Sequence, residues 1–322
     1  MSVRPRVAVS RRLPAPIEER LRTLFDARLN DTGDPLDADA LRLAMTEADA
    51  LVCTVSDRIP ASVIDAQPRR VRLLANYGVG YNHIDIDAAR RAGIVVTNTP
   101  GVLTDDTADL AIALVLMEAR RLGEGERELR SGGWTGWRPT HLIGTRVTGK
   151  TLGIIGMGGI GRAVSRRAHA GFGMRVVYHN RSPVPERDRE GAEPVGTIEA
   201  LLEQSDFVSL HVPATPATRH MIDARSLSRM RRSAFLINTA RGDVVDEPAL
   251  ANALRAGTIA GAGVDVYEGE PEVHPALLGL DNVVLLPHLG SATVESRVAM
   301  GEKVIENLVA FLAGDEPPNR VA

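Results

Sequence analysis

The sequence predicts an α/β protein built from two parallel β-sheets. Short runs of apolar and β-branched residues recur along the whole chain, and amphipathic or alanine-rich segments of helix length separate them. With 322 residues the chain is long for a single core and suits two domains. One long helical stretch interrupts the alternation after about a hundred residues, so the two sheets are expected on either side of it.

The first sheet is expected within the first hundred residues, where four strand-like runs occur: RVAVS, ADALVC, RLLANYG and GIVVTNT. From Thr104 to about Arg130 the sequence predicts one long helix, because capping-type residues open the stretch and Gly132 and Gly133 close it. We interpret this helix as the bridge between the two domains.

The second sheet is expected from six further runs: TLGIIG, RVVYHN, FVSLHV, AFLINTA, IAGAGVDV and NVVLLP. These are enough for a complete doubly wound sheet. No strand follows the last helical stretch, Thr293 to about Leu312, and we expect it to return to the first domain. The predicted domains are therefore residues 1–100 with 291–322, and residues 101–290.

Composition narrows the class of protein. A hydrophobic fraction of 44% and a charged fraction of 25% are ordinary for a globular protein, and no apolar run approaches the ~18 residues of a membrane span. The N-terminus lacks the apolar region of a secretory signal, so a cytoplasmic location is expected. A net charge of −3 does not suggest a nucleic-acid partner. Cys53 is the only cysteine and no metal-ligand spacing occurs, so no metal site is predicted.

The stretch TLGIIGMGGIG at residues 151–161 predicts a dinucleotide site. Gly156, Gly158 and Gly161 have the spacing G-x-G-x-x-G between a strand and a helix. The first glycine allows the tight turn, the second the approach of a pyrophosphate, and the third close packing of helix on strand. The N-terminus of the following helix offers N–H groups and partial positive charge to the phosphates.

The end of the next strand bears on which dinucleotide binds. An acidic residue there would bind the free ribose 2′-hydroxyl of NAD, but this chain has Asn180, Arg181 and Ser182. A guanidinium flanked by two hydrogen-bond donors would attract a 2′-phosphate. The sequence therefore favours NADPH, although a solvated arginine in a surface turn is also consistent with it.

Three later residues each follow an apolar strand, where ligands bind in open α/β sheets: Arg241, Glu270 and His288. Reduction of a ketone needs a proton donor for the developing alkoxide, a partner for that donor, and a cation for an anionic substrate. His288, Glu270 and Arg241 meet these needs in turn. His211 also ends a strand and competes with His288 for the role of donor.

With these stretches in hand, the chain resembles the D-2-hydroxyacid dehydrogenase family, and within it the glyoxylate/hydroxypyruvate reductase branch. The resemblance rests on NYGVGYNHIDIDAARRAGIVVTNTPGVLTDDTADLA, GKTLGIIGMGGIGRAVSRRA, INTARGDVVDEPAL and PHLGSAT, in the family's order. It implies a Rossmann nucleotide-binding domain inserted into a discontinuous flavodoxin-like substrate domain.

The resemblance also implies site residues. Arg241, Glu270 and His288 would be catalytic, with His288 as the acid. The remaining substrate-binding residues would be Val79, Gly80, Ser291 and Trp137, with Arg241 and His288 also touching substrate. The cofactor-binding residues would be Gly156, Gly158, Gly159, Ile160, Gly161, Asn180, Arg181, Ser182, His211, Val212, Pro213, Thr239, Ala240, Asp265 and Gly290. Gly159 departs from the family, where arginine is common, but the three motif glycines are intact.

The implied activity is transfer of a hydride from NADPH, with NADH possible, to C2 of glyoxylate or hydroxypyruvate. Two alternatives stay open: a reductase of a larger 2-oxo sugar acid such as 2-ketogluconate, and a non-catalytic, nucleotide-sensing, corepressor-like protein on the same fold.

Both tryptophans lie in GGWTGWRPTHLIG, residues 132–144. A loop of this length is usually functional or disordered, and two aromatic rings argue against disorder. The rings could pack on their own domain. The resemblance instead implies that the loop crosses to a second subunit and that Trp137 reaches its substrate pocket, so a homodimer is predicted.

Overall fold

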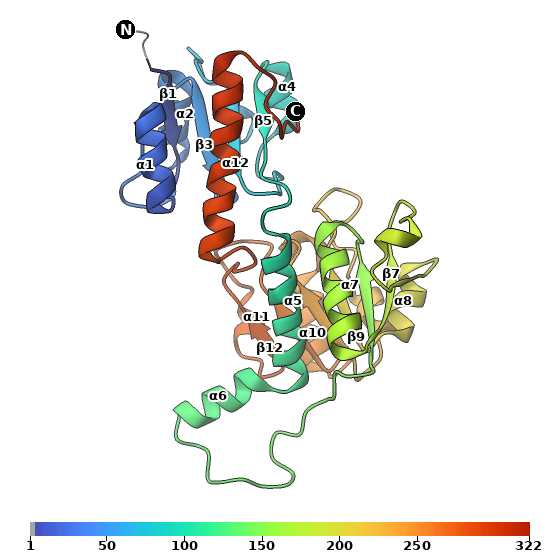
Figure 1. Ribbon diagram of the computed structural model, residues 1–322. Helices are drawn as coiled ribbons and strands as arrows, with labels where there is room; N and C mark the ends of the chain where they lie inside the picture. Colours follow the sequence, from blue (N-terminus) through green and yellow to red (C-terminus); the bar gives the residue numbers. More distant parts are fainter. Residues whose placement is uncertain (1–3) are drawn as a thin grey trace. The chain divides into compact units, whose positions relative to one another are not determined.

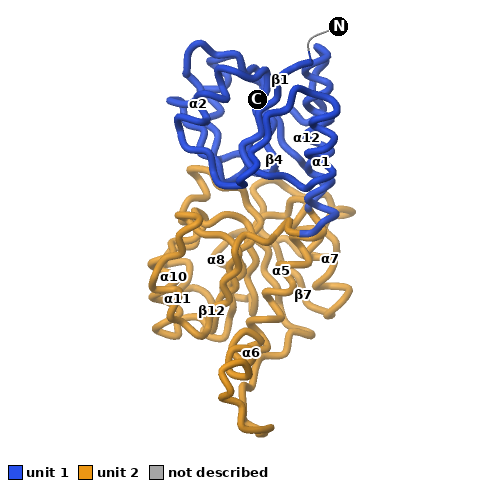
Figure 2. The backbone as a smooth tube through the Cα atoms, turned by 90° about the vertical axis from the view of Figure 1, so that its left-hand side faces the viewer, with its two compact units in different colours: residues 1–103, 293–322 blue, residues 104–292 orange. Residues whose placement is uncertain are grey.

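The computed structural model describes residues 4–322, and the chain divides into two compact units, coloured separately in Figure 2. Unit 1 comprises the residues up to Leu103 together with Thr293–Ala322, and unit 2 is Thr104–Ala292. The division expected from the sequence, after residues 100 and 290, lies three and two residues from these boundaries. Each unit contains one parallel sheet, so the predicted fold class is confirmed.

Unit 1 has a five-stranded parallel sheet in the order β2-β1-β3-β4-β5, which is the flavodoxin-like order. Its strands are β1 (Arg6–Val9), β2 (Asp26–Arg28), β3 (Ala50–Thr54), β4 (Leu73–Tyr77) and β5 (Val95–Thr97). Its helices are α1 (Ala15–Leu24), α2 (Ala38–Glu47), α3 (Ala61–Ile64), α4 (Ile86–Arg91) and α12 (Val294–Ala313). Helices α1 and α12 contribute to the core on one face, and α2, α3 and α4 to the core on the other (Figure 1).

The end of the chain completes unit 1. After α12, the main chain of Val321 and Ala322 hydrogen-bonds with Val96 of β5, at 2.8 and 2.9 Å. The buried side chain of Asn307 in α12 accepts the N–H of Asn319 at 3.1 Å, which fixes the returning segment. The sheet that begins with the first described residues is therefore finished by the last ones.

Unit 2 has a seven-stranded parallel sheet in the order β12-β11-β10-β9-β6-β7-β8, the Rossmann order extended by one strand. Its strands are β6 (Thr151–Ile155), β7 (Arg175–His179), β8 (Glu193–Pro194), β9 (Phe207–Leu210), β10 (Phe235–Asn238), β11 (Gly261–Val264) and β12 (Val283–Leu285). Its helices are α5 (Thr104–Ala119), α6 (Leu122–Arg130), α7 (Gly159–Phe172), α8 (Ile198–Gln204), α9 (Ala224–Arg229), α10 (Glu247–Arg255) and α11 (Pro275–Leu278), with 3₁₀ turns at Glu186–Asp188 and Gly242–Val244.

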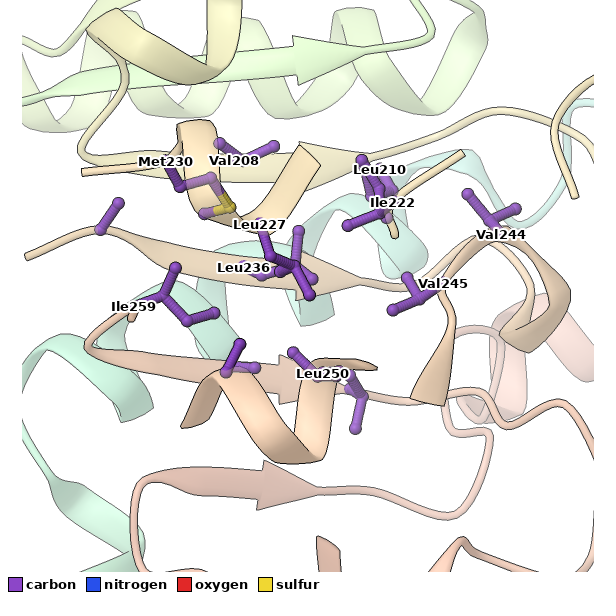
Figure 3. Close-up of a cluster of buried hydrophobic side chains, with 14 of the residues drawn as sticks. Val208, Leu210, Ile222, Leu227, Met230, Leu236, Val244, Val245, Leu250 and Ile259 are labelled. Atoms are coloured by element: carbon purple, nitrogen blue, oxygen red, sulfur yellow. The ribbon is translucent and has the colours of Figure 1, made fainter. Parts of the chain in front are cut away.

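Two hydrophobic cores cover the two faces of the seven-stranded sheet. Helices α5 and α7 build one of them. Helices α8, α9 and α10 build the other, and Figure 3 shows part of it, with Leu227 and Leu250 packed against Leu236 of the sheet. Because both faces are covered, the strands read as nearly continuous apolar runs, which is why they could be recognised in the sequence.

The single helix expected from Thr104 to about Arg130 is wrong: the chain forms two helices. Arg121 has a left-handed backbone, with φ of 53°, and it ends α5 before α6 begins. Arg121 itself is neither glycine nor proline, and the nearby Gly123 and Gly125 lie within α6, so they do not mark where the helix breaks. Figures 1 and 2 show α6 and the following loop extending away from the rest of unit 2.

Two short edge strands, β2 and β8, were also missed, because two or three residues carry too little periodicity to predict a strand. Among residues 4–322, no helix has both the length and the apolar composition needed to cross a membrane.

The contact between α1 and α12 predicts a stability effect at Gly301. A methyl group there would lie closer than 3.0 Å to the side chain of Ile17, which is itself fully buried. We expect Gly301→Ala to lower the free energy of unfolding by about 1–3 kcal/mol through overpacking. In α7, Gly171→Ala adds a methyl that meets nothing within 4 Å, and it should be neutral or slightly stabilising. Thermal and urea unfolding measure both, and equal stability of the two variants would contradict the packing argument.

Candidate active site

The predicted residues of unit 2 gather at the carboxyl ends of its strands. A parallel sheet brings these ends to one edge, where ligands bind in doubly wound folds. The residues in question follow six strands of the sheet: Gly156–Gly161 after β6, Asn180–Ser182 after β7, His211–Pro213 after β9, Thr239–Arg241 after β10, Asp265–Glu270 after β11, and His288–Ser291 after β12.

The glycine-rich turn has the backbone that the motif requires. Gly156 has φ of 98°, and a Cβ there would lie 2.7 Å from the main chain of His211. A Cβ on Gly161 would collide with the carbonyl oxygen of Gly156, so the helix packs closely on the turn. Gly158 caps α7, and its Cβ would meet no atom within 4 Å. The turn therefore leaves open space and free helix N–H groups beside one another, which suits a pyrophosphate.

Two further observations fit a bound dinucleotide. The Oγ1 of Thr239, at the end of β10, is buried and has no hydrogen-bond partner among the described residues, as expected of a group that binds a ligand. A Cβ on Gly159 would make only ordinary contacts with Thr104, the nearest at 3.6 Å. The position that departs from the family therefore has room for a side chain, and its glycine leaves the turn unchanged.

The turn after β7 assigns Asn180 a different task from the one expected. Its Oδ1 accepts the N–H of Met157 at 3.0 Å, and its Nδ2 donates to the carbonyl of Ser182 at 2.8 Å. Asn180 thus ties this turn to the glycine-rich turn, and one of its two amide N–H groups is used within the protein. The side chains of Arg181 and Ser182 in the same turn are exposed.

Glu270 and His288 form a direct pair. The Nδ1 of His288 lies 2.8 Å from Oε2 of Glu270, and the two side chains are 28% and 33% exposed. The other carboxylate oxygen, Oε1, accepts the main-chain N–H of Tyr267 at 3.0 Å. Burial alone would raise the pKa of Glu270, but its hydrogen bonds to His288 and Tyr267 and the charges of His288 and Arg241 lower it. Glu270 is therefore an ionised partner that leaves Nε2 of His288 to exchange a proton.

Asp265 holds the loop that carries His288. Its carboxylate accepts the main-chain N–H groups of Leu289 at 2.6 Å and Gly290 at 2.8 Å, and its carbonyl accepts the N–H of His288 at 2.9 Å. His288 has φ of 55°, a left-handed backbone that needs such support. Burial raises the pKa of Asp265, while the two N–H donors oppose that rise. The resemblance implied only cofactor binding for Asp265, and its role in holding the loop was missed because hydrogen bonds to main-chain groups leave no pattern in a sequence.

Arg241 lies on the turn after β10. The side chain of Asn238 shapes this turn by accepting the N–H of Ala240 and donating to the carbonyl of Arg241, both at 3.0 Å. Burial lowers the pKa of the guanidinium, and the charge of Glu270 counteracts this. Arg241 thus supplies positive charge close to the Glu270–His288 pair.

His211 is a poor proton donor. Its side chain is buried, and that burial lowers its pKa to about 4. Its Nε2 lies 2.8 Å from the hydroxyl of Ser209, inside the protein. An imidazole that stays neutral at physiological pH cannot replace His288 in the role of acid.

The residues predicted in unit 1 lie on the turn after β4. The side-chain amide of Asn76 donates to the carbonyls of Gly78 and Gly80, and that of Asn98 donates to the carbonyl of Val79. Within residues 4–322, the N–H groups of Val79 and Gly80 donate no hydrogen bond to the protein. The turn therefore presents unused main-chain donors, as an anion-binding turn does.

The tryptophan loop does not pack its rings on unit 2. Trp134 is 51% exposed and Trp137 is 83% exposed. The loop is braced against α6, because His141 Nε2 lies 2.7 Å from Glu128 Oε2. Leu122, Leu129 and Ile143 of this projecting segment are also at least half exposed.

Comparison with known proteins places these features in a family. A family model described as the NAD-binding domain of D-isomer specific 2-hydroxyacid dehydrogenases matches residues 112–290. The glyoxylate reductase of Thermococcus kodakarensis is 47% identical over 99% of this chain and 96% of its own. The structure of an NADPH-dependent glyoxylate/hydroxypyruvate reductase from Sinorhizobium meliloti, in complex with NADP and malonate, superposes with a TM-score of 0.88 at 39% identity, covering 99% and 97% of the two chains. A glyoxylate reductase structure from Paecilomyes thermophila gives 0.87 at 34% identity, covering 100% and 99%.

The Glu270–His288 pair predicts a shift in proton affinity. In Glu270→Gln the imidazolium of His288 loses a carboxylate partner, so it should release its proton at a pH lower by about one unit. Histidine NMR signals followed against pH measure this, with the His288 signal assigned from a His288→Gln variant. Glu272→Gln, an exposed change two residues away, is the control and should leave the titration in place. An unchanged titration in Glu270→Gln would show that Glu270 is not the partner.

Proposed function

This chain belongs to the D-isomer specific 2-hydroxyacid dehydrogenase family, and we propose that it reduces glyoxylate and hydroxypyruvate to glycolate and D-glycerate with NADPH. The observation that carries the proposal is the 2.8 Å contact between His288 and Glu270, beside the charge of Arg241. It supplies a proton donor and a cation, which together suit reduction of an anionic ketone or aldehyde.

The proton transfer follows from the geometry of the pair. The cofactor supplies a hydride to C2 of the 2-oxo acid. Since Nδ1 of His288 is directed to Glu270, Nε2 is the nitrogen that gives a proton to the oxygen as negative charge develops on it. The carboxylate of Glu270 stabilises the imidazolium before the transfer and keeps the ring in one orientation. The product is the 2-hydroxy acid, and the imidazole regains its proton from solvent.

The carboxylate of the substrate is matched by two kinds of donor. Arg241 offers a guanidinium, the side chain best suited to bind a carboxylate through two hydrogen bonds. The unused N–H groups of Val79 and Gly80 support the proposed role of their turn in carboxylate binding. For Ser291 the proposal of a substrate contact rests on family resemblance and on its place three residues after His288.

NADPH is proposed on the basis of Arg181. No acidic side chain stands at the end of β7, and an exposed guanidinium there favours a 2′-phosphate over a free hydroxyl. The Sinorhizobium meliloti relative, which is NADPH-dependent and was crystallised with NADP, supports the same choice. NADH remains a second, weaker cofactor in this proposal.

We also propose that the protein is a cytoplasmic homodimer formed through α6 and the tryptophan loop. Five large apolar side chains are exposed on this segment, and such a concentration is typical of interfaces. The 83% exposure of Trp137 supports its proposed contact with the partner subunit, because an indole gains most from burial. A membrane or nucleic-acid partner is not part of the proposal.

The proposed activity is tested by loss of NADPH absorbance with glyoxylate, hydroxypyruvate and 2-ketogluconate. We expect the two smaller acids to give higher kcat/KM, and His288→Ala to reduce turnover at least about 100-fold while NADPH still binds, because the proton is needed only as the alkoxide forms. Faster reduction of 2-ketogluconate would move the assignment to sugar acids. Tight NADPH binding without turnover of any 2-oxo acid would instead indicate a nucleotide-sensing protein.

The cofactor preference is tested by Arg181→Asp. One charge contact at about 4 Å is worth ~1 kcal/mol in water and ~4 kcal/mol at an effective dielectric of 20, so the ratio of kcat/KM for NADPH over NADH should fall about 10- to 100-fold. Arg187→Asp makes the same charge change at an exposed position of the following 3₁₀ turn and should leave the ratio within about twofold. Equal efficiency with both cofactors in the native protein would refute the preference.

The dimer is tested by analytical ultracentrifugation and by Trp137→Ala. We expect a dimer, and we expect the variant to change relative kcat/KM across the 2-oxo acids while its KM for NADPH stays within about twofold, since the ring is proposed to meet substrate. Trp134→Ala removes the other exposed ring of the loop as a control. A fully active native monomer, or an unaltered substrate preference in Trp137→Ala, would show that the loop serves only its own chain.

A further inference from the structure

Glu270 lies in a tight loop, residues 268–274, between β11 and α11. Glu272 donates its N–H to the carbonyl of Gly269 at 3.0 Å, so the loop closes on itself around Glu270. Within so short a loop, the direction of the Glu270 carboxylate depends on how the two ends are held. Two side chains that take no direct part in the proposed reaction, Glu247 and Tyr267, hold the main chain around the Glu270–His288 pair.

Glu247, the first residue of α10, binds the start of this loop. Its side chain is buried, with the residue 7% exposed, and Oε1 accepts the N–H of Glu268 at 2.7 Å. The main chain of His274, at the far end of the loop, acts on the same carboxylate and lowers its pKa. Burial raises the pKa of Glu247, and the neighbouring charge of Glu268 adds to the rise, whereas the two main-chain bonds and the charge of His274 oppose it. A carboxyl is rarely buried without a task.

Tyr267, which precedes the loop, connects the two members of the catalytic pair. Its N–H donates to Oε1 of Glu270, and its hydroxyl donates to the carbonyl of Leu286 at 2.9 Å, two residues before His288. Burial raises the pKa of this phenol well above its usual range, with the charges of Asp265, Glu247 and Glu270 adding to the effect. The hydroxyl therefore remains a donor at every physiological pH.

The turn that carries Arg241 packs against the main chain of Tyr267 and Glu268. A Cβ on Gly242 would overlap the main chain of Tyr267 and Glu268, so only glycine allows this approach. Around the loop, the carboxylate of Glu268 pairs with Arg219 and with His220, whose Nε2 lies 3.1 Å away. The charged groups that act on Glu270 itself are His288, Arg241 and Asp265.

We propose that Glu247 and Tyr267 are positioning residues that hold Glu270 against His288, and that they thereby set the pH range in which His288 acts as a proton donor. The inference rests on the proposed function, since it concerns the same pair. Glu247 acts through the main chain next to Glu270, and the hydroxyl of Tyr267 acts through the main chain of Leu286, which precedes His288.

The first test replaces Glu247. Glu247→Ala removes the acceptor of the Glu268 N–H, so Glu270 should lose its fixed orientation and stabilise the imidazolium less well. We expect the alkaline limb of kcat for glyoxylate to move to lower pH by about half a unit, and kcat at pH 8 to fall about threefold, with the KM for NADPH within about twofold. Glu247→Gln keeps a carbonyl oxygen as acceptor and should restore most of both. Glu118→Ala, which removes another buried carboxyl of unit 2, is the control and should leave the limb in place.

The second test replaces Tyr267. Tyr267→Phe removes only the hydroxyl and should shift the alkaline limb in the same direction by a smaller amount. Tyr178→Phe is the control and should leave the alkaline limb in place. It removes a phenol hydroxyl from a buried residue of β7, a strand that leads to neither Glu270 nor His288. Thermal unfolding of all variants separates a loss of stability from a change in the pair. If Glu247→Ala does not fold, Tyr267→Phe decides.

The histidine NMR titration of His288 keeps this inference separate from the proposed function. If the native protein fails to reduce any 2-oxo acid, the proposed function is wrong, yet the imidazole titration still reports the geometry of the pair. A lower titration pH in Glu247→Ala and in Tyr267→Phe supports the inference. A titration and an alkaline limb that match the native protein in both variants, with only stability reduced, would overturn it.

Discussion

The hydrogen bonds of Asp265 with the loop after β12 are the constraint on which the site depends. They hold His288 in a left-handed backbone, from which its imidazole reaches Glu270. The anchoring carboxylate is 1% exposed, so its two N–H partners replace the water it would otherwise need. The buried carboxylate fixes the position of the loop, and it connects the end of β11 to the end of β12 at the edge of the sheet where the predicted site residues lie. Within unit 2, Asp265 thereby positions the proton donor through its carboxylate and its carbonyl, which bind the main chain of the loop.

Much of the architecture could be predicted because each strand of a parallel sheet is buried on both faces. Such strands appear as short apolar runs, and the residue that follows each run lies at a known edge. That reasoning alone was enough to bring Arg241, Glu270 and His288 to one edge of unit 2, where the structure confirms the contact between the last two. That reasoning could not separate His288 from His211, since both residues follow a strand. Only the burial of the His211 imidazole, which lowers its pKa, separates them.

What escaped prediction depends on main-chain geometry. The left-handed Arg121 splits one helical stretch into α5 and α6, and the residue that takes this backbone is an arginine and not the nearby Gly123. The bonds of Asn180 to Met157 and Ser182 could not be foreseen, because an amide can serve a phosphate or a peptide equally well. Nothing in the sequence singles out Glu247, because acidic residues are common at helix starts for electrostatic reasons.

The completion of unit 1 by the last residues of the chain has a consequence for biosynthesis. The core of its first face includes Met300, Val304 and Leu308 from α12, and β5 is paired by Val321 and Ala322. The ribosome therefore synthesises all of unit 2 before it adds α12 and the C-terminal residues, which complete unit 1. Domains generally fold as units while synthesis proceeds. We therefore expect the part of unit 1 that precedes Thr104 to complete its core only after the nearly two hundred residues of unit 2 have been translated.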